Sequence, residues 1–111
     1  MDSTTIINNF TDILDEYGLT VDSFDSCNSK LAECFNEFEY VFTIENYSEC
    51  MFFVRCIKET EYVVEIMDRY SHTRVEGQPC DTLVQAFNSC IEKYQSSMES
   101  IVKIYNVLQG R

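Results

Sequence analysis

The residues in this chain that could perform chemistry are six cysteines, one histidine and a large number of carboxylates. The cysteines are Cys27, Cys34, Cys50, Cys56, Cys80 and Cys90. Their separations of 7, 16, 6, 24 and 10 residues contain no Cys-x-x-Cys pair, and His72 is the only histidine. Zinc modules need such pairs or additional histidines. Asp22 and Asp25 lack the glycine and the final glutamate of a calcium-binding loop. We therefore expect no metal site.

The same residues make a weak case for catalysis. A cysteine nucleophile would need His72 as its base, and His72 lies in a polar turn where we expect it to be solvated. Carboxylates are numerous, but no apolar surroundings single out one member of a pair for a raised pKa. The three glycines stand at the ends of predicted elements and form no phosphate-binding loop. The sequence predicts a protein that is not an enzyme and has no catalytic residue and no cofactor.

The carboxylates are also the strongest signal for a partner. The chain has 19 acidic and 8 basic residues, a formal net charge of −11. Residues 1–54 hold 11 of the acids and one base, so this half carries −10 of the total. Such a field repels nucleic acid and anionic membranes and attracts basic surfaces. We expect a basic protein partner, with no direct contact to nucleic acid or membrane; simple solubility is the alternative reason for the charge.

Cysteine usage and the N-terminal sequence indicate a reducing compartment. The six cysteines among 111 residues fall below the roughly 8–10% that marks a disulfide scaffold. No basic and apolar leader follows Met1, and no apolar run reaches the ~18 residues of a membrane span. We expect reduced thiols and a cytoplasmic protein, located in the host cytoplasm if the chain is viral.

The N-terminal part of the chain predicts helices joined by a polar connector. One apolar stripe at helical spacing comprises Ile6, Ile7, Phe10, Ile13, Leu14 and Tyr17. Gly18 ends this helix, residues 19–29 form a polar connector, and residues 31–38 form a short second helix. Asp12, Asp15 and Glu16 point away from the stripe and are candidate partner-binding residues.

From Glu39 the hydrophobic period changes from helical to alternating, which predicts strands. The strands span residues 39–45, 50–58 and 61–67, with a short fourth strand at residues 72–75. The connections at 46–48 and 59–60 are short, so neighbouring strands should be antiparallel. The predicted fold is α+β, a single domain over residues 1–111 with a three- to four-stranded antiparallel meander flanked by an N-terminal helix and a long C-terminal helix.

One face of this predicted meander combines charged and apolar side chains. Four acids surround one base and four apolar residues: Glu39, Glu45, Glu61 and Glu65 around Arg55, with Val41, Met51, Phe53 and Ile57 between them. An apolar centre rimmed by carboxylates suits a basic protein partner, because burial stabilises the complex while charge steers the encounter. The alternative is that the second helix or the fourth strand covers this face.

The most regular pattern in the chain lies between Asp81, a candidate cap, and Gly110, a natural stop. Apolar residues alternate at spacings of three and four: Val84, Phe87, Ile91, Tyr94, Met98, Ile101, Tyr105 and Leu108. A helix of this length measures about 40 Å, more than the diameter of about 34 Å expected for a compact chain of this size. Either the helix bends at Ser96-Ser97, or its far end pairs with another chain. The candidate self-association residues are Met98, Ile101, Tyr105 and Leu108, and the outcome would be a homodimer.

These features lead to two hypotheses of different classes. In size, acidity and lack of catalytic residues, the chain resembles the inhibitors that phages direct against host nucleases, including anti-CRISPR proteins and DNA mimics. The resemblance implies a non-enzymatic inhibitor whose carboxylates imitate phosphates in the basic channel of a nuclease or other nucleic-acid-binding enzyme. The second hypothesis is a dimeric chaperone, or an immunity or assembly protein, that holds a client on its sheet face. Salt would weaken the first kind of complex far more than the second.

Overall fold

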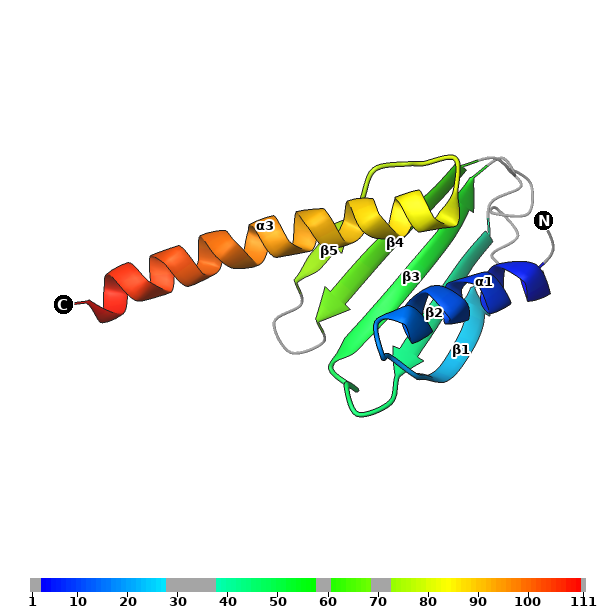
Figure 1. Cartoon of the computed structure of the whole chain (residues 1–111), viewed down its shortest axis with the longest axis horizontal. Coiled ribbons are helices and arrows are strands. Elements are labelled where there is room, and N and C mark those ends of the chain that lie inside the picture. The colour runs from blue at the N-terminus through cyan, green and yellow to red at the C-terminus, as the bar shows by residue number, and fades with distance from the viewer. Residues whose placement is uncertain (1–2, 28–37, 58–60, 69–72, 111) are drawn as a thin grey trace.

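The computed structural model describes residues 3–27, 38–57, 61–68 and 73–110, which form two layers (Figure 1). Along the chain the elements are α1 (Ser3–Glu16), β1 (Val21–Cys27), β2 (Phe38–Ile44), β3 (Cys50–Ile57), β4 (Glu61–Asp68), β5 (Arg74–Glu76) and α3 (Leu83–Gln109). The strands make one antiparallel sheet in the order β1-β2-β3-β4-β5. Both helices pack on the same face of this sheet. The α+β class and the meander are therefore confirmed.

Alternation along the strands decides which side chains meet the helices, although Val63 on the other face of β4 is also buried. Tyr40, Phe42 and Ile44 on β2 are 2%, 0% and 3% exposed, as the alternating pattern predicts. The register then aligns one apolar row across four strands, because Phe42 pairs with Phe52, Phe52 with Ile66, and Ile66 with Val75. This row is the floor on which both helices lie.

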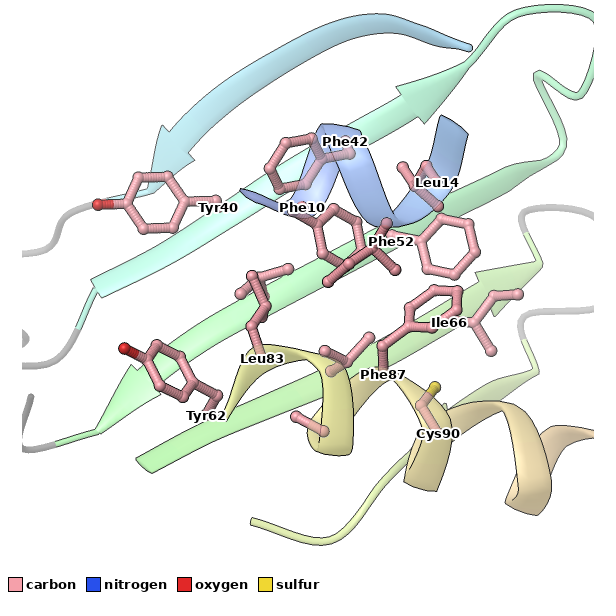
Figure 2. Packing of buried hydrophobic residues seen from close by; sticks show 14 of the residues in the cluster. Phe10, Leu14, Tyr40, Phe42, Phe52, Tyr62, Ile66, Leu83, Phe87 and Cys90 are labelled. Carbon is pink, nitrogen blue, oxygen red and sulfur yellow. The ribbon is translucent and has the colours of Figure 1, made fainter. Parts of the chain in front are cut away.

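Phe10 of α1 is the centre of the core (Figure 2). Its ring centroid lies 4.7 Å from that of Phe42, 5.8 Å from that of Phe52 and 5.8 Å from that of Phe87 on α3. One aromatic side chain thus joins the first helix, the sheet and the last helix. Tyr17, expected in the same stripe, is instead 56% exposed, and its ring centroid lies 5.3 Å from that of Phe87.

The polar connector predicted for residues 19–29 is wrong, because Val21–Cys27 is the edge strand β1. An edge strand needs little burial. Val21 of β1 packs against the core, and Phe24 is 55% exposed, with its ring centroid 6.4 Å from that of Phe42. The Ser23 and Thr43 hydroxyls, 2.5 Å apart, join β1 to β2. Five strands therefore replace the three or four that were expected. The second helix predicted at residues 31–38 and the turn at 59–60 lie outside the described residues, except that Phe38 opens β2.

The long helix is confirmed, with corrections at its start and on its buried face. The side chain of Thr82, rather than that of Asp81, caps α3 by accepting a hydrogen bond from the Gln85 N–H at 3.2 Å. Val84 is 54% exposed. The buried positions are Leu83, Ala86, Phe87 and Cys90, because a helix on a sheet buries a broad stripe of period 3.6 rather than a coiled-coil seam. The helix continues to Gln109 without turning back at Ser96-Ser97.

Gly77 allows α3 to approach the sheet closely. A Cβ atom at this position would stand 2.6 Å from the backbone nitrogen of Cys90 and 2.9 Å from its Cα. The Gly77 N–H also donates to the carbonyl of Val64 on β4 at 3.0 Å. The chain between β5 and α3 is thus held against both layers.

Candidate functional site

The two helices leave part of the sheet uncovered, and an apolar pocket of about 220 Å³ opens there. It lies between the end of α1, the β2–β3 turn and the middle of α3. Eight residues line it: Leu19, Ile44, Tyr47, Cys50, Phe52, Ile66, Ile91 and Tyr94. Ligand sites are characteristically concave and mainly apolar, with a few polar groups at the edge. This pocket is our candidate binding site.

Two local turns bring its walls together. Gly18 takes a φ of +73° and ends α1, after which the Leu19 N–H donates to the carbonyl of Leu14 at 3.0 Å. The chain then passes beside the end of β2, where the Glu45 N–H donates to the carbonyl of Thr20 at 2.8 Å. Asn46, with a φ of 69°, reverses the chain into β3. The α1–β1 and β2–β3 connections therefore lie at the same end of the molecule.

Carboxylates surround this end. Asp15 and Glu16 lie in the last turn of α1, Glu45 follows the pocket residue Ile44, and Glu49 precedes the pocket residue Cys50. Asp68 stands opposite Cys50 in the β3–β4 register. We call these five residues, Asp15, Glu16, Glu45, Glu49 and Asp68, the acidic end. On α3, the exposed base Lys93 directly precedes the pocket residue Tyr94.

The electrostatics of the pocket follow from burial among acids. Burial raises the pKa of the Cys50 thiol, and the negative charges of Asp68 and Glu49 raise it further. Burial likewise raises the pKa of the Tyr94 hydroxyl, with smaller contributions from Cys50 and Asp68. Both groups are therefore neutral at physiological pH. The site presents an apolar interior and a negative rim.

The acids of α1 stand where they oppose helix stability. The C-terminal end of a helix carries a partial negative charge, so bases are favoured there and acids are not. The last turn of α1 nevertheless has Asp15 and Glu16 and no base, while its first turn has no acid. Residues that oppose the stability of their own helix in this way are characteristic of surfaces with a function.

The predicted partner-binding residues divide between two separate surfaces. Asp15, Glu16 and Glu45 are exposed at the acidic end, and Asp12 is exposed one turn earlier on α1. The others, Glu39, Arg55, Glu61 and Glu65, lie on the sheet face opposite the helices or at its edge. The sequence therefore found the acids of the pocket rim but grouped Glu45 with the wrong surface, because Glu45 falls in the turn after β2 rather than on the strand.

Ion pairs neutralise part of that opposite sheet face. Arg74 binds Glu65 through both Nε and Nη2 and lies over the Phe53 ring, with its guanidinium carbon 5.2 Å from the ring centroid. Arg55 Nη2 is 3.3 Å from Glu76 Oε1, while its buried Nε has no hydrogen-bond partner in the described part of the chain. β5 extends this face rather than covering it. Within the described residues, no such ion pair involves Asp15, Glu16 or Glu45.

The remaining predicted groups occupy ordinary structural positions. Cys50, Cys56, Cys80 and Cys90 are free thiols, and burial raises the pKa of Cys56 and of Cys90 to about 11. Cys34 and His72 lie outside the described residues. Over residues 3–27, 38–57, 61–68 and 73–110, no group of three or more His, Cys, Asp or Glu could hold a metal ion. None of the helices described has the length and apolarity needed to cross a membrane.

The predicted self-association residues lie on the part of α3 that leaves the sheet (Figure 1). Leu108 is 62% exposed and Met98 is half-buried. The helix includes Ile101 and Tyr105, whose side chains lie outside what the structure describes. Ile104 and Val107, which the pattern of alternating threes and fours left out, are 64% and 67% exposed.

Sequence reasoning missed the pocket itself. Leu19 sat in the supposed connector, and Tyr47 in a turn assigned only a linking role. The useful signal was the pair of apolar residues, Ile91 and Tyr94, that continue the α3 stripe beyond its fully buried part. Comparisons with protein-family models, with curated proteins and with solved structures found no match to this chain.

Proposed function

We propose that this protein is a non-enzymatic binding protein that engages a basic protein surface through its acidic end. The observation that carries the proposal is an apolar pocket beside Asp15, Glu16 and Glu45, which form no ion pair with any other described residue. The fitting partner presents an apolar side chain flanked by bases, or a lysine or arginine whose aliphatic stem enters the pocket.

The size of the pocket supports insertion of one side chain. An apolar cavity of about 150 Å³ accepts benzene, and this pocket measures about 220 Å³. Its floor, Phe52 and Ile66, offers contact area without hydrogen-bond partners. Burial would therefore supply affinity, while the surrounding carboxylates would steer the partner and fix its orientation.

The class of partner follows from the charge. A protein with a concentrated basic surface is most often one that handles nucleic acid. Carboxylates placed like those of Asp15, Glu16 and Glu45 can take the position of phosphates in such a site. We therefore propose an inhibitor of a nuclease or other nucleic-acid-binding enzyme that competes with nucleic acid.

The test is a pull-down from native lysate with the immobilised protein at about 0.05 M and about 0.5 M salt. Captured proteins are then challenged with duplex DNA. We expect a nucleic-acid-binding enzyme that elutes with salt and with DNA, and whose activity falls when the protein is added. Capture that DNA does not reverse, or an enzyme that stays fully active in the complex, contradicts the proposal.

Matched charge-reversal variants test which surface of the protein binds the partner. Glu16→Lys with Glu45→Lys should abolish capture, because both acids lie at the acidic end. Glu39→Lys with Glu61→Lys changes the net charge equally on the opposite side and should leave capture largely intact. If the second pair abolishes capture and the first does not, the sheet face is the binding surface.

The opposite sheet face favours the second candidate function, a client-holding chaperone or an immunity or assembly protein. Val41, Met51, Phe53, Ile57 and Met67 lie on this face and are half-buried. An apolar area of this kind would hold a client through contacts that salt does not weaken. Suppression of the aggregation of a thermally unfolded test protein, retained at about 0.5 M salt and lost in Phe53→Glu, would support this candidate. Lack of suppression by the wild type would exclude it.

A further inference from the structure

The last four turns of α3 form an arm that leaves the body of the protein. The molecule measures 54 × 26 × 24 Å, and its long dimension runs along this helix (Figure 1). The last side chains of α3 that pack against the core are Ile91 and Tyr94. We call residues 95–110 the arm and residues 3–94 the body. Ile104, Val107 and Leu108 on the arm are 64%, 67% and 62% exposed.

The arm repeats the apolar face that the body buries. Eighteen residues make five full turns of an α-helix, so positions eighteen apart lie on one line along its surface. Ile104 stands on the line of Ala86, and Leu108 on the line of Cys90. Ala86 and Cys90 are both 0% exposed, against 64% and 62% for the arm residues. The same sequence separation links Leu83 with Ile101 and Phe87 with Tyr105. The helix therefore presents one continuous apolar face, of which the sheet covers the first half.

The distribution of charge indicates what covers the exposed half of this apolar face. The arm contains one acid and one base, Glu99 and Lys103, and is neutral, whereas residues 1–94 contain 18 acids and 6 bases, a net −12. This net charge makes the bodies of two copies repel each other, whereas two neutral arms do not. A basic partner, in contrast, is attracted to the body and gains nothing from the arm. A second arm matches this one in length, in apolar spacing and in charge.

We infer that the arm pairs antiparallel with the arm of a second copy. When the twofold axis passes residue 103, Met98 of each copy lies opposite Leu108 of the other, and Ile104 lies next to the axis. In the alternating spacing of threes and fours, Met98 takes an a position and Leu108 a d position, and an antiparallel coiled coil sets a against d. The Tyr94 positions of the two copies are then about 27 Å apart along the paired helices. This separation of the two bodies is well beyond the Debye length of about 8 Å. Parallel pairing would bring the two acidic bodies side by side.

This arrangement leaves the acidic end of each body free, so the inference does not depend on the proposed function. It yields a rod with one body at each end. From the 54 Å length of one copy, the rod measures about 85 Å when the arms overlap around residue 103. A parallel dimer keeps the length of one copy.

Sedimentation velocity and small-angle X-ray scattering of the full chain at tens of micromolar test the inference. We expect a dimer with a maximum dimension of about 85 Å. Leu108→Glu and Ile104→Glu should each convert it to a monomer with an unchanged circular dichroism melt, because neither residue touches the body. Asn106→Glu adds the same charge in the same turn on the opposite side of the helix, and it should leave the dimer intact.

Three results would overturn the inference. The first is a monomeric wild type at these concentrations. The second is a dimer no longer than one copy, which would mean parallel pairing. The third is a dimer that Asn106→Glu disrupts as strongly as Leu108→Glu does, which would place the contact elsewhere.

Discussion

Replacing Asp15 and Glu16 of the acidic end by lysine should make the protein more stable. Both carboxylates lie in the last turn of α1, where the helix dipole already concentrates negative charge. Each charge at a helix end is worth about 0.3–1 kcal/mol, and the double reversal removes two unfavourable charges and adds two favourable ones. Because both side chains are exposed and solvent screens their charges, we expect a gain of about 1–2 kcal/mol in the free energy of unfolding.

Urea denaturation followed by circular dichroism measures this gain. An unfolding entropy of about 2.1 cal/mol/K per residue converts 1–2 kcal/mol into a rise in Tm of roughly 4–9 °C. Asp12→Lys with Asp22→Lys is the control, since it makes the same change in net charge away from the helix end. The difference between the two variants should shrink in about 1 M salt, where the Debye length is near 3 Å. Equal stabilisation by both variants would show that net charge, and not the helix end, is responsible.

Loss of partner capture in the stabilised variant would show that the acids are kept for binding.

Three further outcomes test the packing. Gly77→Ala should lower the free energy of unfolding, measured with urea, by about 3 kcal/mol, because the new Cβ would clash with the backbone of Cys90. Gly18→Ala has open space around it but a φ of +73°, so it should lower the same free energy by only about 1 kcal/mol. The reverse order would refute this account. Phe10→Ala should lower the free energy of unfolding by about 3–5 kcal/mol, since three ring contacts are lost at a fully buried position. A decrease of less than about 1 kcal/mol would mean that the helices do not pack as described. Burial raises the pKa of Cys56 and Cys90 to about 11, against about 8.5 for an unfolded thiol. The contribution of these thiols to stability is therefore complete below about pH 8.5 and is lost as the pH rises toward 11. Urea midpoints that stay constant over this pH range would contradict this prediction.

The sequence predicted the parts of the fold in which burial repeats with a clear period. Tyr40, Phe42 and Ile44 alternate as a strand facing a core, and Phe10 stands in a helical stripe, so both were assigned correctly. β1 was missed because an edge strand buries almost nothing. Its residues are mostly Asp and Ser, and what makes it a strand is the pairing of Val21 with Ile44 and of Asp25 with Val41 on β2. Pairing with a distant segment leaves no periodic trace in the strand itself.

The site was predictable in its charges and not in its shape. Asp15, Glu16 and Glu45 were identified because composition alone marks the N-terminal half as acidic. Their convergence depends on the hydrogen bond between the Glu45 N–H and the Thr20 carbonyl, which joins two turns separated along the chain. The pocket lies between Leu19, which follows α1, and Ile91 and Tyr94 on α3. Its shape therefore depends on where the two helices lie on the sheet rather than on any single residue.

The order of the elements along the chain also constrains when the core can form. Every strand pairs with its neighbour in sequence, so the meander can assemble as it leaves the ribosome. Its apolar row, however, is covered from both ends of the described chain, by Phe10 and by Phe87, whose rings meet at 5.8 Å. Phe87 is synthesised after all five strands. Until α3 emerges, Phe52 and Ile66 lack half of their cover, and the nascent sheet is at its most prone to aggregation. The core described here is therefore completed only by α3, which packs closely against Gly77.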